Sequence, residues 1–201
     1  MDVTRWSTAD QKSARERRAS VRLLADRAHY EDVILGALSR ARVSVWISTA
    51  NLKEVMIEAP IGSAARARDR YLSITARFLE LVRRGVEVRI LHASAPSRPL
   101  SKALGRRPEL APPAFELRQC PRVHMKIIAV DGSYLYVGSA NFTGAGLGAK
   151  GDGRRNFELG ICTDDDWMLD AVQERFERIW SGGECRGCRL RADCVAPLSD
   201  E

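Results

Sequence analysis

Five residues between positions 124 and 141 have side chains suited to chemistry at a phosphate: His124, Lys126, Asp131, Ser139 and Asn141. His124 and Lys126 are two positions apart in an apolar run, so their side chains are expected on one face of a strand. A neutral imidazole is an available nucleophile near pH 7, and the ammonium, hydroxyl and amide groups can stabilise charge on phosphate oxygens. These residue types therefore indicate nucleophilic attack on a phosphodiester.

A β-hairpin is predicted to bring these groups together. Asp131-Gly132 is a strong two-residue turn signal between apolar strands at residues 123–130 and 134–137. The returning strand carries Ser139 and Asn141 back to the end where His124 lies. Asp131 is expected to orient the hairpin from its turn rather than to carry a proton.

This segment resembles the signature of the phospholipase D superfamily, which reads His-x-Lys, four residues, Asp, six residues, Gly-Ser-x-Asn, and every fixed position is matched. The resemblance extends to Asn156-Phe157-Glu158, where the family commonly places a carboxylate, and more loosely to residues 20–181 as one repeat. It implies an α/β fold with a mixed β-sheet flanked by helices on both faces. It also implies cleavage through a covalent phosphohistidine that requires no metal at the catalytic site.

In this family, a histidine from a second copy of the motif protonates the leaving oxygen, but this chain has a single copy. His29 and His92 lack the lysine two residues later and are interpreted as structural. The chain thus resembles the small bacterial endonucleases of the superfamily, which make one active site from two subunits. We predict a homodimer in which His124 of one subunit attacks and His124 of the other acts as acid. Glu158 is expected to accept the other ring proton of a histidine.

Length and composition favour one catalytic domain with two appendages. The 201 residues are 45% hydrophobic, enough for a single core. The predicted divisions are a basic N-terminal extension at residues 1–19, the catalytic domain at 20–181 and a cysteine-rich metal-binding tail at 182–201. No run resembles a signal peptide or approaches the ~18 residues of a membrane span, which favours a cytoplasmic protein without stable membrane insertion. The net charge of +6 favours nucleic acid as the partner, although anionic lipid attracts the same cations.

The predicted elements alternate between helices and strands. Apolar spacing typical of a helix runs through residues 10–41, interpreted as a solvated basic helix rather than a DNA-tracking surface. Strands at 42–49 and 86–91 flank a helix at 66–84, and this order predicts a parallel pair. A basic, proline-rich loop is expected at 94–114. Strands at 115–118, 123–130, 134–137 and 157–163 and a helix at about 165–180 complete the domain.

The segment 143–155 is rich in glycine and contains a Gly-x-Gly-x-x-Gly pattern, but it leads into a strand, so a dinucleotide site is excluded. Its glycines are expected to let the backbone pass close to a phosphate. The cations of this segment and the adjacent amide are candidate ligands for flanking phosphates: Lys150, Arg154, Arg155 and Asn156. For the cations, simple solvation is an equal alternative. Residues 48–52 weakly echo residues 138–142, but without a histidine nearby they are given no catalytic role.

Three cysteines lie within ten residues of the C-terminal tail, at Cys185, Cys188 and Cys194. Because disulfides are rare in the cytoplasm, this spacing favours a metal site over buried free thiols. It is similar to the C-terminal three-cysteine pattern of iron-sulfur nucleases, in which an upstream cysteine completes a 4Fe-4S cluster, although only these three residues resemble them. Four thiolates also suit zinc, so the choice between iron-sulfur and zinc stays open.

Strand direction indicates the fourth cysteine. If the strands at 123–130 and 157–163 both flank the antiparallel strand between them, they run the same way. A helix of ~16 residues then returns the chain about 24 Å, to the edge where Cys120 lies. We therefore predict Cys120 as the fourth ligand and Cys162, at the far end, as a small buried apolar residue. The metal is expected to be structural, because hydrolysis requires no electron transfer.

These observations favour a metal-independent phosphodiesterase, specifically a nuclease that cleaves DNA or RNA. A phospholipase D or phosphatidyltransferase acting on lipid phosphodiesters is the alternative enzyme. Against it stand the single motif, the lack of an apolar anchor and an aromatic content of 6%. A catalytically silent nucleic-acid-binding module is the third interpretation.

Overall fold

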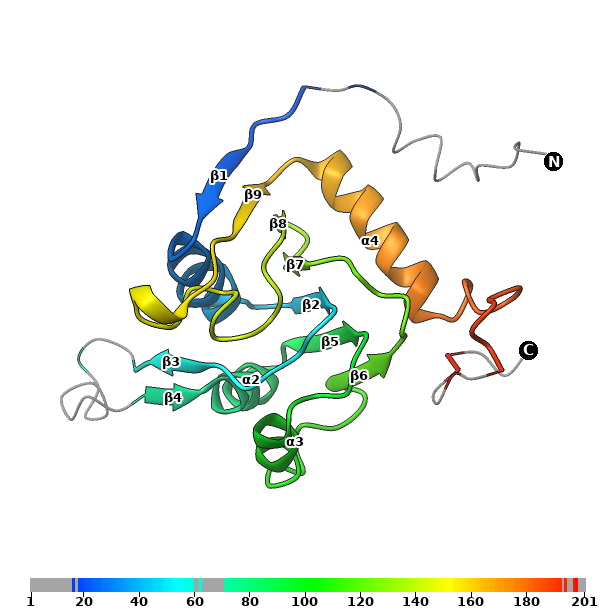
Figure 1. Cartoon of the computed structure of the whole chain (residues 1–201), viewed down its shortest axis with the longest axis horizontal. Coiled ribbons are helices and arrows are strands. Elements are labelled where there is room, and N and C mark those ends of the chain that lie inside the picture. Colours follow the sequence, from blue (N-terminus) through cyan, green and yellow to red (C-terminus); the bar gives the residue numbers. More distant parts are fainter. Residues whose placement is uncertain are drawn as a thin grey trace.

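The structure is a computed structural model that describes Glu16, residues 18–59, Gly62, residues 71–192, Cys194 and residues 197–198. Within these residues, one seven-stranded sheet has the order β1-β9-β8-β7-β2-β5-β6 (Figure 1). Its strands are β1 (Arg22–Ala25), β2 (Ser44–Thr49), β5 (Glu87–His92), β6 (Phe115–Gln119), β7 (Ile127–Val130), β8 (Tyr134–Gly138) and β9 (Leu159–Thr163). The pairs β2–β5 and β5–β6 are parallel, and the other four pairs are antiparallel.

Helices cover both faces of this sheet, which confirms the mixed α/β fold expected from the sequence (Figure 1). The π-helical segment η1 (His29–Leu38) and helix α2 (Ile74–Arg83) pack on one face, and α4 (Asp166–Trp180) packs on the other. Consecutive apolar residues of β7 serve both faces, since Ile128 lies in the core with η1 and α2 while Ile127 packs with Leu169 of α4. Such continuous apolar runs are typical of strands buried on both sides.

Smaller elements lie in the connections. A separate antiparallel pair is formed by β3 (Met56–Glu58) and β4 (Tyr71–Ser73), and the connections also hold α3 (Arg98–Leu104) and the 3-10 turn η3 (Asp152–Arg154). Among the residues that the structure describes, no helix has the length and apolar content needed to cross a bilayer.

Several sequence-based expectations differ from the structure. Residues 22–25 form strand β1 rather than helix, because they pair with β9 and tertiary pairing overrides local spacing. The helix expected at 66–84 begins only at Ile74, after β4, and residues 63–70 lie outside the described part of the chain. The loop expected at 94–114 contains α3, whose Pro99 occupies the first turn, where proline costs no hydrogen bond. Most of the predicted N-terminal extension, residues 1–15 and 17, also lies outside the described residues.

The predicted Asp-Gly hairpin is present between β7 and β8. Asp131 and Gly132 have φ angles of 54° and 61°, and the Ser133 N–H donates to the Val130 carbonyl oxygen at 3.0 Å, as in a type I′ turn. Ser133 is an additional residue of the connection, because the strands pair Val130 with Tyr134. Strands β7 and β9 begin later than predicted, at Ile127 and Leu159. His124 and Glu158 therefore lie on the segments that lead into these strands, at the sheet edge where β2, β5, β6 and β8 end.

Candidate active site

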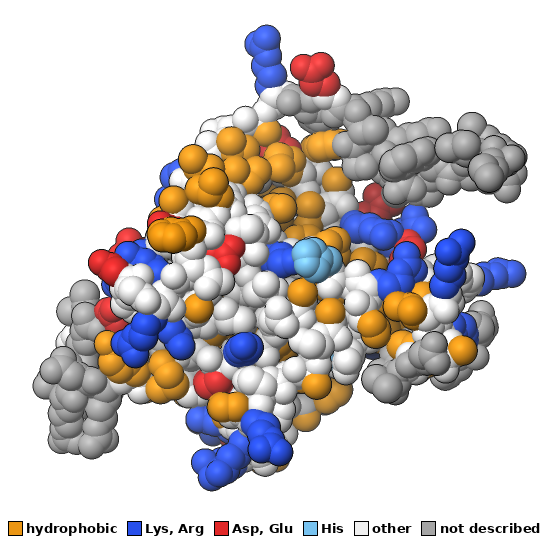
Figure 2. Space-filling view, viewed as in Figure 1, with side chains coloured by type: hydrophobic (Ala, Val, Ile, Leu, Met, Phe, Trp, Pro, Cys, Tyr) orange, Lys and Arg blue, Asp and Glu red, His pale blue; other side chains and the backbone are white. Residues whose placement is uncertain are grey.

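His124 and Lys126 form the centre of the site. His124 is exposed, whereas the side chain of Lys126 is buried, with the residue 9% exposed. The Lys126 Nζ lies 3.2 Å from both ring nitrogens of His124 and donates to the His124 carbonyl oxygen at 2.7 Å. Figure 2 shows a histidine at the surface of this face, beside basic and acidic side chains. An exposed imidazole thus lies next to a buried cation.

The ammonium group of Lys126 is partly shielded from water. Burial lowers the pKa of Lys126 below its usual value, and the charge of Glu158 opposes that shift. The Gly138 backbone N–H donates to the Lys126 carbonyl oxygen at 3.1 Å, which ties this lysine to the start of the Gly-Ser segment. The carboxylate of Glu158 therefore supports the charged form of the lysine that a phosphate needs.

Glu158 also holds the hydroxyl of the site. Ser139 Oγ donates a hydrogen bond to the Glu158 carboxylate, which accepts a second one from Asn156 Nδ2 at 3.0 Å. The Leu159 N–H donates to Ser139 Oγ at 3.1 Å. Within the described part of one chain, Glu158 bonds Ser139 and Asn156 rather than a histidine. The expected contact of Glu158 with a histidine ring stays a prediction for an assembly of two chains.

Asn141 is positioned by the segment that ends β2. Its Oδ1 accepts from the Asn51 N–H at 3.1 Å and from Thr49 Oγ1 at 3.3 Å. Thr49 Oγ1 in turn accepts from the Phe142 N–H at 2.9 Å, and Leu52 pairs with Phe142. Because these bonds engage the Asn141 side-chain oxygen, its amide NH2 group is the part that can donate to a phosphate oxygen. No role was expected for Thr49 and Asn51 from the sequence, although the echo between residues 48–52 and 138–142 was the signal for this pairing.

Asp26 is a further residue that supports the site and for which the sequence indicated no role. Its carboxylate accepts from the Glu158 N–H at 3.0 Å, and its own N–H donates to the Glu158 carbonyl oxygen at 3.0 Å. Asp26 adopts a φ of 45°, a conformation that aspartate tolerates better than most residues. Because 132 positions separate Asp26 from Glu158, no local pattern could have indicated this contact.

Asp131 lies apart from this group, at the other end of the β7–β8 hairpin. Its carboxylate accepts backbone N–H bonds from Arg42 at 2.9 Å, Val43 at 2.8 Å and Ser44 at 2.9 Å. These bonds fix the entry to β2. Asp131 belongs to the sequence signature of the candidate catalytic residues, but these contacts fit the hairpin-orienting role expected for it from the sequence.

The glycine-rich segment follows Asn141 and carries the candidate phosphate ligands. Lys150 and Arg154 are exposed, and Arg155 forms an ion pair with Asp152. The Asn156 N–H donates to the Ala145 carbonyl oxygen at 3.1 Å, which closes the segment on itself. No contact between these three cations and His124 is seen in the described structure, so their role in binding phosphates stays a prediction.

The other two histidines are buried. His29 is 0% exposed and packs edge-on against Tyr136, with ring centroids 5.3 Å apart. His92 lies with its Nδ1 3.0 Å from the Ser94 carbonyl oxygen, and burial lowers its pKa. Of the three histidines, His124 alone is open to solvent. A second catalytic imidazole is thus not supplied by His29 or His92 in this arrangement.

Four of the five cysteines line one pocket beside the site: Cys120, Cys185, Cys188 and Cys194. Cys162 lies instead in the core of the opposite sheet face, with η1 and α2. Among the residues that the structure describes, no group of three or more His, Cys, Asp or Glu side chains is arranged to hold a metal ion.

Comparison with known proteins identifies the family. The chain matches the family model described as "Cardiolipin synthase, PLD-like domain" over residues 34–180. The chain therefore belongs to the phospholipase D superfamily, and the activity supported at this level is that of a phosphodiesterase. No curated protein sequence matches the chain.

Solved structures show the same fold at low sequence identity. Nuc from Salmonella typhimurium, described as a phospholipase D family member, is 20% identical with a TM-score of 0.54, covering 82% of this chain and 95% of Nuc. NucT from Helicobacter pylori is 15% identical with a TM-score of 0.52, covering 80% of this chain and 95% of NucT. TrmBL2, an archaeal chromatin protein described with a novel mode of DNA binding, is 15% identical with a TM-score of 0.50, covering 80% of this chain and 52% of TrmBL2.

Proposed function

We propose that this protein is a metal-independent phosphodiesterase that cleaves nucleic acid, with two copies of the chain completing each reaction. The observation that carries the proposal is the contact of an exposed imidazole with a buried cation, His124 with Lys126, at 3.2 Å. Asn141 supplies its amide NH2 as a donor at the same sheet edge, while the Ser139 hydroxyl proton bonds Glu158. Preorganised donors of this kind stabilise the charge that develops on phosphate oxygens in the transition state.

The proposed reaction has two displacements. A ring nitrogen of His124 attacks phosphorus, and a P–N bond forms as the bond from phosphorus to the leaving oxygen breaks. The protonated His124 of the second copy gives its proton to that oxygen. Water then attacks the phosphohistidine, loses its proton to the second imidazole, and breaks the P–N bond, which restores both histidines.

An uncovered apolar surface supports the pairing of two copies. Helix α4 covers β7 and β8 but leaves the neighbouring edge of that sheet face open, and Figure 2 shows hydrophobic side chains gathered there, over β1 and β9. We call it the β1–β9 apolar face, and its exposed residues are Val21, Leu23, Phe157 and Leu159. Phe157 is 97% exposed and flanks Glu158. Burying this face against a second copy would bring two sites together and remove apolar surface from water.

The net charge of the chain and a protein of similar fold favour nucleic acid as the substrate. The net charge of +6 suits a polyanion, and the cations of segment 143–155 lie next to the site in sequence. TrmBL2, which shares the fold, is described as binding DNA. The family description names cardiolipin synthase, so lipid is the substrate that the experiment has to exclude.

The test incubates purified protein with end-labelled single- and double-stranded DNA, with RNA, and with phosphatidylglycerol vesicles, all in EDTA. We expect cleavage of nucleic acid that His124→Ala abolishes and that weakens steeply with added salt. A quenched single turnover is expected to trap a protein–nucleotide adduct that His124→Ala lacks. Cleavage or transfer of the lipid alone would contradict the nucleic-acid assignment, and turnover that survives in His124→Ala would contradict the mechanism.

The dimer is tested at the β1–β9 apolar face. Leu23 is 69% exposed and makes no part of the proposed chemistry, so Leu23→Glu places a charge in the interface without touching the site. We expect light scattering to show a dimer for the wild type and a monomer of low activity for Leu23→Glu. Val43→Glu, at a 66% exposed position before β2, is the matched control and is expected to stay dimeric. A fully active monomer would contradict the shared site.

A further inference from the structure

We propose that Cys120, Cys185, Cys188 and Cys194 bind a metal centre through four thiolates, either a zinc ion or an iron-sulfur cluster, next to the segment that carries His124. The four cysteines come from two places in the sequence, the end of β6 and the C-terminal tail, yet they line one pocket. The pocket has a volume of about 80 Å³ and mostly apolar walls, which include Val123, Ile179 and Leu198. Thiolates that converge from separate segments are typical of closed, four-ligand metal sites.

Successive reverse turns present the three tail cysteines. The Cys185 N–H donates to the Gly182 carbonyl oxygen at 2.8 Å, Cys188 to Cys185 at 3.1 Å, and Cys194 to Arg191 at 3.3 Å. Each such turn brings residues three apart to within about 7 Å between Cα atoms. Gly187 supports the first cysteine pair with a φ of 71°, which residues with a side chain rarely adopt. The tail is therefore folded so that its cysteines face the same pocket.

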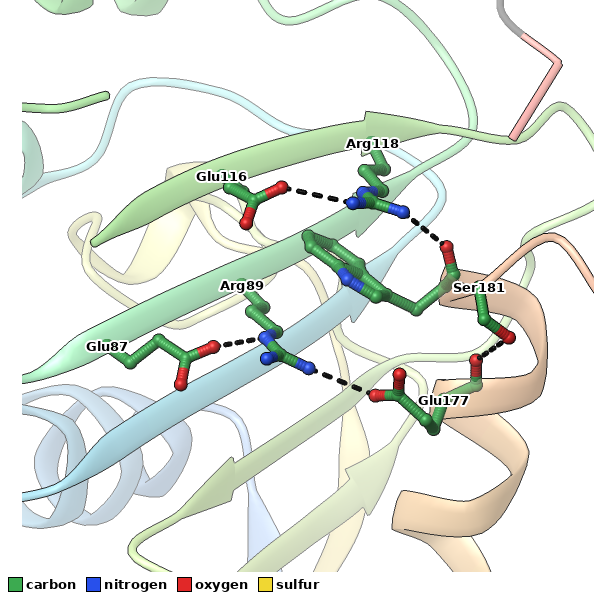
Figure 3. Close-up of polar contacts among 7 residues, drawn as sticks. Glu87, Arg89, Glu116, Arg118, Glu177 and Ser181 are labelled. Atoms are coloured by element: carbon green, nitrogen blue, oxygen red, sulfur yellow. Dashed lines mark hydrogen bonds and ion pairs between the residues drawn. The ribbon is translucent and has the colours of Figure 1, made fainter. Parts of the chain in front are cut away.

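The end of α4 is clamped to the sheet where Cys120 lies. Arg118 of β6 donates to the Trp180 carbonyl oxygen at 2.8 Å, and its guanidinium lies 4.4 Å from the centre of the Trp180 ring. Arg89 of β5 bonds Glu177 at 3.0 Å, as Figure 3 shows together with the Arg118 contact. These contacts hold the point where the tail leaves the helix beside Arg118, which precedes Cys120 by two residues in sequence.

Cys120 itself is held rigidly. Its N–H donates to the His92 carbonyl oxygen at 2.9 Å, and its own carbonyl accepts from the Val123 N–H at 2.9 Å. Val123 is buried at 2% exposure and precedes His124 in sequence. A metal bound by Cys120 would thus fix the turn from which His124 projects.

Metal binding has to tighten the tail. No three of the cysteines are arranged to hold an ion in the described structure, whereas sulfurs around one zinc lie about 3.8 Å apart, given Zn–S bonds of about 2.3 Å. The turns that carry the three tail cysteines need only move closer to Cys120, because all four cysteines already line the same pocket. Binding would therefore be coupled to the final folding of the tail, as in other small metal sites.

The surrounding charge suits such a centre. Four thiolates with one zinc carry a net charge of about −2, which is costly in an apolar pocket without cations nearby. Arg122, Arg175 and Arg191 line the pocket together with Glu184, which pairs with Arg175, and the Arg122 guanidinium interacts electrostatically with the Cys188 side chain. The pocket therefore combines four sulfur ligands with compensating positive charge.

The experiment measures metal in the full-length protein, purified under argon, independently of any nuclease activity. We expect one zinc per chain, or about four irons with acid-labile sulfide and brown absorbance, and X-ray absorption showing four sulfur neighbours at about 2.3 Å for zinc. Cys120→Ser is expected to lower the sulfur count to three or to release the metal. Cys162→Ser is the matched control, since that cysteine lies in the core away from the pocket, and it is expected to keep the full complement.

Cys188→Ser tests the same site from the tail, and its circular dichroism is expected to match the wild type because Cys188 lies outside the sheet. The proposal is overturned if reduced protein lacks metal and does not take up zinc or reconstitute a cluster under argon. It is also overturned if mass spectrometry shows these cysteines paired as disulfides in freshly isolated protein. If Cys162→Ser loses the metal while Cys120→Ser retains it, Cys120 is not the fourth ligand, and the shared pocket does not mark the metal site.

Discussion

At the scale of single residues, the site depends on the balance between one buried cation and one buried carboxylate. Glu158 raises the pKa of Lys126 while burial lowers it. Glu158→Gln removes the opposing charge, so the pKa of Lys126 falls further and the lysine loses its proton at a lower pH. We predict that the alkaline limb of the kcat/KM profile moves to lower pH. We also expect kcat to fall, by up to about 100-fold, because Ser139 loses its charged acceptor and shifts.

The matched control for this change is Glu174→Gln, which neutralises an exposed carboxylate on α4. Both variants alter the net charge equally, so a general electrostatic effect on a polyanionic substrate would appear in both. An alkaline limb that does not move in Glu158→Gln would mean that Lys126 does not limit the rate at high pH.

Asp131 provides a second test at this scale. Asp131→Ala removes the acceptor of three backbone N–H groups and places alanine at a left-handed φ of 54°. We predict a loss of about 2–4 kcal/mol in the free energy of unfolding, measured by urea denaturation. Asp131→Asn keeps a side-chain oxygen and tolerates this φ, so its loss is expected to be smaller. Activity per folded molecule should be retained in both variants, and a loss of kcat without a loss of stability would return Asp131 to the catalytic group.

At the scale of elements, the sequence predicted the hairpin and the sheet that carry His124, Lys126, Ser139 and Asn141. These predictions succeed because an Asp-Gly turn and apolar strands are local signals that tertiary contacts reinforce. Strand β1 was missed because its pairing with β9 joins Leu24 to Gly160 across the whole chain. The same long-range pairing brings Asp26 to Glu158, so the support of that carboxylate was equally invisible in the sequence.

The pairing of β8 with β9 beside the site depends on two glycines. Gly138 lies opposite Gly160, and the buried ring of Tyr136 packs over both, so that a Cβ added at Gly160 would overlap the ring. We predict that Gly160→Ala costs about 1–3 kcal/mol in stability and lowers kcat, since Ser139 and Glu158 flank this pair. In a Tyr136→Ala background the added methyl group has room, and its cost should largely disappear, as a double-mutant cycle would show.

Gly151→Ala is the control for Gly160→Ala, because its Cβ would meet no atom within 4 Å and its φ of −62° suits any residue. We expect a change in stability within about 0.5 kcal/mol. An equal cost for Gly160→Ala with and without the Tyr136 ring would show that backbone freedom, rather than the ring, explains the glycine.

At the scale of the whole molecule, one chain holds half of the proposed chemistry. The exposed imidazole, the cation and the donors lie together, but His29 and His92 are buried in the fold and the apolar face over β1 and β9 is left open. The sequence leads to the proposal of a second copy, because one motif supplies one nucleophile. It could not predict the surface that a second copy would cover, because exposure of Leu23 and Leu159 follows from where α4 lies.

Mixing wild-type chains with His124→Ala chains tests whether each site needs both copies. If subunits exchange freely at equal concentrations, about one quarter of the dimers are wild type, half are mixed and one quarter carry no His124. When both histidines serve one site, mixed dimers are inactive, so the wild-type chains keep about half of the activity that they show alone. When each chain works by itself, they keep all of it. We predict the first result, measured as cleavage of labelled DNA after unfolding and refolding the two proteins together. Leu23→Glu chains, which should not pair, are expected to leave the wild-type activity unchanged in the same assay, and inhibition by them would indicate competition for substrate instead of a shared site.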